Sequence, residues 1–123
     1  MIVAIAVGLA GACGAVARYL TDGLVQDRTT GAFPFGTMTV NAVGSLVLGV
    51  VTGMFWYHGL TVAPRAIVGD GFCGGLTTWS TASFETVRLA EEGMAATALV
   101  NALGGLAVSV AAAALGIVIV ALI

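Results

Sequence analysis

This sequence carries very little charge. Only 8% of its 123 residues are charged, and the basic ones are just four arginines. A soluble domain usually carries about 25% charged residues, so this chain cannot cover itself with a wetted surface. Hydrophobic residues make up 59%, and the mean hydropathy is +1.10. The composition therefore predicts an integral membrane protein, and the absence of a basic patch argues against nucleic acid as a partner.

Motifs of enzymes and metal centres are also missing. The two cysteines, Cys13 and Cys73, lie in apolar or glycine-rich stretches without a CxxC pair or a His/Cys cluster. They are typical of small packing residues rather than of a disulfide or a metal site. No nucleophile–base pair or phosphate-binding loop is present, and GxxGG within an apolar segment is too weak to indicate a nucleotide site. We therefore expect no enzymatic activity.

What the sequence does have is long apolar runs. A helix that crosses a bilayer needs about 20 mostly apolar residues. Pro34 and Pro64 are expected to precede the second and third helices. We predict an all-α integral membrane protein in which residues 1–123 form a single domain of four transmembrane helices, at about 2–20, 35–57, 65–89 and 94–122.

The arginines orient these helices only weakly. The loops after the first and third helices share a side that holds Arg18, Arg28 and Arg88, whereas Arg65 lies on the other side. Cytoplasmic loops carry an excess of basic residues, so the side with three arginines is slightly favoured as cytoplasmic. The bias is small enough that insertion in both orientations stays open.

Small residues predict close helix contacts. The chain contains 18 glycines, with Gly8, Gly11 and Gly14 in the first helix and Gly49 and Gly53 in the second. Small side chains let helix backbones approach each other in membranes. The contacts can lie within one protomer or against a second copy. We expect both, because a pathway needs more than four helices.

Polar residues at membrane depth are functional candidates by default. A spacing of four keeps residues on one helix face, and two helices carry such a stripe. For Asn41 we expect a functional role, whereas for Asn101 a role as an interhelical hydrogen-bonding residue is equally compatible with the pattern. The stripes are Thr37, Asn41 and Ser45 in the second helix, and Thr97, Asn101, Gly105 and Ser109 in the fourth.

The third helix contains the stretch 71-GFCGGLTTWSTASFE-85. Its three glycines are poor helix formers, so we predict a helix break there that frees backbone carbonyls. Irregular backbone at membrane depth is tolerated inside protein or beside a water-filled cavity, and broken transporter helices use such carbonyls to bind small cations.

After the predicted break, Thr77, Thr81 and Glu85 fall on one face, with Trp79 and Ala82 on a neighbouring one. Glu85 therefore continues a line of hydroxyl groups. The alternative is that Glu85 lies in water and pairs with Arg88.

Two residues at the ends of helices have simpler interpretations. Arg18 closes the first helix, either as a side chain that reaches the interface or as a positive charge that concentrates anions in a vestibule. His58 follows the second helix and is expected in a wet loop without a role.

The chain resembles the Fluc/CrcB fluoride channel family along its whole length. The resemblance is carried by 11-GACGAVARY-19, 36-GTMTVNAVGSLVLG-49 and the stretch quoted above. It implies passive export of fluoride through the cell inner (plasma) membrane. It also implies that two subunits, identical or homologous, pack antiparallel in the lipid as a dual-topology dimer with two narrow pathways.

The resemblance also implies site residues. Asn41 matches the pore asparagine of the family, and Arg18 matches the arginine of the first motif. A structural sodium ion at the dimer centre is implied on the backbone carbonyls of Gly74 and Thr77. Fluoride is strongly hydrated, so its path needs N–H and O–H donors or aromatic edges, and a narrow path can reject chloride by size. The predicted pathway residues are Asn41, Trp79, Thr81, Ala82, Ser83, Glu85, Asn101 and Ser109.

Three positions depart from the family pattern. The family has phenylalanine at positions 79 and 82, where this chain has Trp79 and Ala82, and Gly105 stands where a serine is usual. The chain therefore lacks one expected ring and one expected donor. Our hypothesis is either a homodimer with an altered pathway or a heterodimer with a similar subunit.

Two other functions compete with this one. A small proton-coupled exporter needs a carboxylate within its first helix, but here none precedes Arg18 and Asp22, and Glu85 is the only substitute. A non-transporting subunit that assembles with a partner is the second alternative, favoured by Ala82 in the aromatic motif.

Overall fold

A computed structural model describes all residues 1–123, which are helical and connected by short turns without any strand. Three helices are long and apolar enough to cross a membrane. The bounds confirm the first, second and fourth predicted segments, although the first helix continues six residues past its predicted end. They are α1 (Ile2–Gln26), α2 (Phe35–Tyr57) and the continuous run of α6 (Ala95–Leu99), the π-helical η2 (Val100–Gly104) and α7 (Gly105–Ala121).

The third segment consists of shorter pieces. Helical structure begins at Val62, so Pro64 lies inside the first turn, where a missing N–H costs nothing. None of the pieces has the length of a membrane span by itself. They are α3 (Val62–Arg65), the π-helical η1 (Ala66–Cys73), α4 (Gly74–Leu76) and α5 (Trp79–Glu91).

The glycines of this segment are helical, contrary to the prediction of a break at their positions. The backbone is extended instead at Thr77 and Thr78, with φ and ψ of -81° and 159°, and of -150° and 119°. Gly71 and Gly75 face α1 so closely that an added Cβ would overlap the carbonyls of Val7 and Gly11. The glycines thus permit close helix packing, and the interruption follows them.

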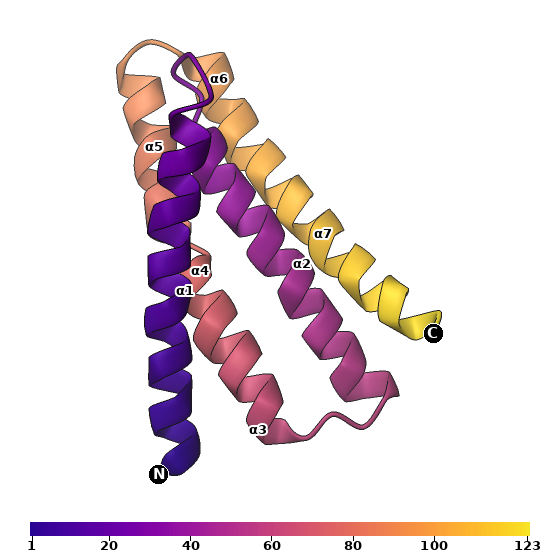
Figure 1. Cartoon of the computed structure of the whole chain (residues 1–123). Coiled ribbons are helices and arrows are strands. Elements are labelled where there is room, and N and C mark those ends of the chain that lie inside the picture. Colours follow the sequence, from indigo (N-terminus) through magenta and orange to yellow (C-terminus); the bar gives the residue numbers. More distant parts are fainter.

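The helices lie side by side in two closely packed pairs (Figure 1). In one pair, α1 runs parallel to η1 and α4. In the other, α2 runs alongside α7, and Gly49 and Gly116 bring the two backbones together because a Cβ at either position would overlap backbone atoms of the other helix. The glycine spacing at 49 and 53 therefore serves packing within the chain, whereas Gly8 has open space around it.

His58 connects the C-terminal ends of α2 and α7. Its ring Nε2 donates a hydrogen bond of 3.0 Å to the carbonyl of Val120, near the end of α7. Carbonyls in the last turn of a helix lack partners within the helix. The prediction that His58 has no role is therefore wrong: it joins the ends of two helices.

Candidate functional site

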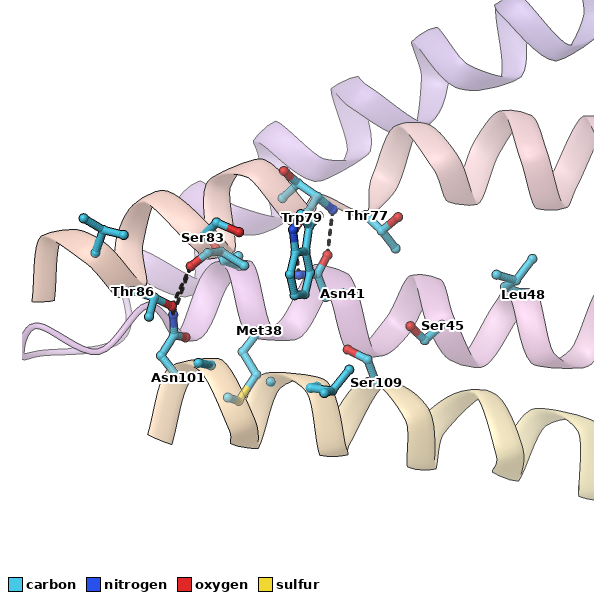
Figure 2. A pocket seen from close by; sticks show the side chains of 17 residues that line it. Met38, Asn41, Ser45, Leu48, Thr77, Trp79, Ser83, Thr86, Asn101 and Ser109 are labelled. Atoms are coloured by element: carbon cyan, nitrogen blue, oxygen red, sulfur yellow. Dashed lines mark hydrogen bonds between the residues drawn. The ribbon is translucent and has the colours of Figure 1, made fainter. Parts of the chain in front are cut away.

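A groove of about 450 Å³ opens between α2, α5, η2 and α7 (Figure 2). Polar side chains from both predicted stripes reach it, together with the exposed indole of Trp79. Thr97 of the fourth-helix stripe and the predicted pathway residues Thr81 and Glu85 do not line it. The predicted pathway residues that do are Asn41, Trp79, Ala82, Ser83, Asn101 and Ser109.

Asn41 holds the interrupted backbone. Its Oδ1 accepts a hydrogen bond of 2.7 Å from the Thr78 N–H, and its Nδ2 donates one of 3.0 Å to the Thr78 carbonyl. In a continuous helix the Thr78 N–H would donate to the Gly74 carbonyl. The Asn41 amide therefore takes the place of a backbone partner, and one of its two N–H groups stays free towards the groove.

The side chain of Thr78 starts the next helix. Its Oγ1 accepts from the Thr81 N–H at 3.2 Å and lies 3.0 Å from the Thr81 hydroxyl. Threonine is a favoured N-cap residue because its oxygen satisfies an N–H that the first turn leaves unpaired. This signal was present in the sequence and could have located the start of α5 at Trp79.

Asn101 connects η2 to α5. Its Nδ2 donates to the Thr86 hydroxyl at 2.9 Å and to the Ala82 carbonyl at 3.3 Å, and its side chain is nearly buried. Both N–H groups are used in these bonds. Of the two interpretations of Asn101, the contacts favour the interhelical one.

The hydrogen-bond donors left in the groove come from other residues. Ser45, Ser83 and Ser109 make no hydrogen bond within the chain, and Asn41 keeps one N–H. Trp79 is 76% exposed and adds an indole N–H. The groove thus offers several unused donors to a ligand, which suits an anion.

Glu85 lies beside the groove and contacts α2. Its Oε1 accepts a hydrogen bond of 3.0 Å from the hydroxyl of Thr37, whose exposure is only 2%. The other carboxylate oxygen is buried without a partner. The alternative pairing of Glu85 with Arg88 is wrong, because Arg88 forms its ion pair with Glu92 at 3.6 Å.

A second cavity of about 230 Å³ lies between α1, α2 and α5. Arg18 lines it and donates a hydrogen bond of 3.2 Å from a guanidinium nitrogen to the Thr77 carbonyl. Thr81 lines this smaller cavity, while Thr37 and Thr78 line both and form a polar partition between them. The arginine therefore points to the interruption from a vestibule-like space.

These features define a helical membrane protein with a polar groove at an interrupted helix. Residues 5–117 match the family described as CrcB-like protein, Camphor Resistance (CrcB). The chain therefore belongs to the CrcB family, and the resemblance found in the sequence is confirmed.

Individual relatives agree over most of the chain. It is 47% identical to the fluoride-specific ion channel FluC 1 of Leifsonia xyli subsp. xyli, covering 94% of this chain and 85% of the relative. It is 42% identical to the fluoride-specific ion channel FluC of Geobacter metallireducens, covering 95% of each. Since the family is one of ion channels, the chain is not an enzyme.

Proposed function

We propose that this chain is a subunit of a passive, fluoride-selective channel that exports fluoride through the cell inner membrane. The observation that carries the proposal is the set of unused N–H and O–H groups in the groove, at Asn41, Ser83 and Ser109. A fluoride ion that loses water needs such donors. The names of the relatives support fluoride as the ion.

The proposal includes four membrane crossings and an antiparallel dimer. Parallel packing of η1 and α4 along α1 supports a crossing by the third segment, because α1 is itself of membrane length. The open groove and the exposed Trp79 support a second copy, which would cover them and narrow the path. The copy can be identical or homologous, in an orientation opposite to the first.

The proposal also includes a structural sodium ion. Carbonyl oxygens are suitable ligands for a small cation. The Gly74 carbonyl no longer receives the Thr78 N–H, and the Thr77 carbonyl lies on extended backbone and keeps one lone pair beside Arg18. These two oxygens of each copy would hold the ion, which supplies positive charge between the subunits.

Fluoride efflux from liposomes that contain the purified chain alone tests the function, with chloride efflux as the comparison. We expect rapid fluoride efflux and negligible chloride efflux. Asn41→Asp should abolish fluoride efflux, because the new carboxylate repels both the anion and the Thr78 carbonyl. Equal efflux of the two anions, or unchanged fluoride efflux in Asn41→Asp, would contradict the proposal.

A heterodimer is the second candidate, favoured by the small Ala82 beside the exposed Trp79 in the groove. In that case the chain alone gives no efflux, and addition of a second, homologous subunit restores it. A proton-coupled mechanism would use Glu85. If Glu85→Gln leaves fluoride efflux and its pH dependence unchanged, the proton-coupled mechanism is excluded.

A further inference from the structure

Asp70 is an exposed carboxylate in the middle of η1, within the third segment. It takes part in no hydrogen bond or ion pair of this chain, whose only ion pair is Arg88–Glu92. The nearest arginine in sequence, Arg65, places its guanidinium over the Phe55 ring, 5.3 Å from the centroid. An acidic side chain without a partner is costly within a membrane, and its own chain gives Asp70 none, so we expect a partner from outside the chain.

The face that carries Asp70 is free to receive such a partner. Gly71 next to it packs on α1, and Gly69 packs on Leu48 of α2. Asp70 points away from both helices. Gly74, one turn further on, is exposed on the same face, and a Cβ there would meet nothing. Another helix can therefore approach this face closely.

The depth of Asp70 in the bundle follows from its neighbours. Gly14 lies midway along α1 and packs against the Leu76 N–H, while Gly71 packs against Val7. Leu76 therefore marks the middle of the third segment. Asp70 precedes Leu76 by six residues, or about 9 Å at 1.5 Å per residue. Arg18 lies four residues to the other side of the middle, or about 6 Å.

We propose that Asp70 accepts a charge-assisted hydrogen bond from Arg18 of the partner subunit, in a second copy of opposite orientation. Inversion of one copy brings the two side chains to nearly the same depth. Arg18 has no acidic partner within 4.0 Å in its own chain. One hydrogen bond to Thr77 leaves most of its five N–H groups free. This inference rests on the antiparallel dimer proposed above, and the pair would form twice.

Cross-linking between differently tagged copies tests the pair. Asp70→Cys in one copy and Arg18→Cys in the other are co-expressed, both with Cys13→Ala and Cys73→Ala. A bis-methanethiosulfonate reagent is suitable, because the Cβ atoms of an Asp–Arg pair lie farther apart than the ~4 Å of a disulfide. We expect a cross-linked dimer with both tags. As a control, Asp70→Cys with Leu122→Cys should give none, because Leu122 is exposed at the end of α7 and inversion places it on the other side of the membrane.

A second measurement uses the charge alone. Asp70→Asn removes both pairs of the dimer and should weaken dimerisation roughly eight- to three-hundredfold, whereas Asp27→Asn, at an exposed acid beyond α1, should leave it unchanged. If Asp70→Cys cross-links only to itself in a dimer, or Asp70→Asn has no effect, the pair is overturned and the dimer stands. If light scattering of the unmodified chain shows a monomer, the dimer fails as well, and fluoride efflux then decides whether the proposed function survives.

Discussion

The α2–α7 pair and the interrupted third segment satisfy their backbone polar groups at membrane depth in opposite ways. Along α2 and α7, glycines bring apolar helices into direct backbone contact, and the backbone stays helical through the contact. At Thr77 and Thr78 the helix stops, and side chains such as Asn41 pair with the backbone in its place.

This difference separates stability from function. Where Gly49 and Gly116 bring α2 and α7 into contact, no space is left for a ligand, so a substitution there should change folding alone. The interruption leaves donors and carbonyls unused beside a groove. Irregular backbone in a membrane is tolerated only in such places, so the same residues hold the fold and line the site.

The largest effect is expected for Gly49→Ala in the α2–α7 pair. The added methyl group would overlap the backbone of Ala113, which cannot rotate away. We expect a loss of about 2–3 kcal/mol in the free energy of unfolding, measured by titration with a denaturing detergent. Gly8→Ala is the control, since open space surrounds Gly8 and its stability should be unchanged or slightly higher. Equal stability of the two variants would contradict the close packing.

Asn41→Ala should have the next largest effect. It leaves the N–H and carbonyl of Thr78 without partners, so we expect a loss of about 2 kcal/mol in the free energy of unfolding. Fluoride efflux should fall as well. Ser45→Ala changes the same face of α2 without removing a hydrogen bond, and should leave stability unaltered. A stable Asn41→Ala variant with lost efflux would show that Asn41 serves the pathway alone.

Within the groove, Asn101→Ala and Ser109→Ala distinguish a residue that stabilises the fold from one that serves the fluoride pathway. Asn101 uses its donors on α5, so its loss should reduce the free energy of unfolding by about 1 kcal/mol. Ser109 makes no hydrogen bond in the chain, so Ser109→Ala should slow fluoride efflux without a change in stability. The reverse pattern, with Asn101→Ala stable and inactive, would assign the pathway to Asn101.

The smallest effect is expected for His58→Ala at the end of the α2–α7 pair. It removes one partly exposed hydrogen bond to Val120, worth about 0.5–1 kcal/mol. Fluoride efflux should be unaltered, because His58 follows the end of α2, whereas Leu48 is the last residue of α2 that lines the groove. A larger loss of stability would show that the two helix ends depend on this contact more than one hydrogen bond explains.

Composition and periodicity predicted much of this molecule correctly. The apolar runs located α1, α2 and the α6–α7 run, because a membrane helix must satisfy its own backbone and needs a fixed length. The spacing of four placed Asn41 and Ser45 on one face, and the contacts of α2 confirm it.

Other features were decided only by the tertiary structure. Glycine has no side chain, so the sequence does not distinguish a helix break from a close helix contact; the neighbouring α1 made Gly71 and Gly75 contact residues and moved the interruption to Thr77. Nor does periodicity show which atom receives a donor. Asn41 and Asn101 carry the same amide in similar stripes, but the extended backbone left Asn41 one free N–H, while the carbonyl of Ala82 and the hydroxyl of Thr86 took both from Asn101.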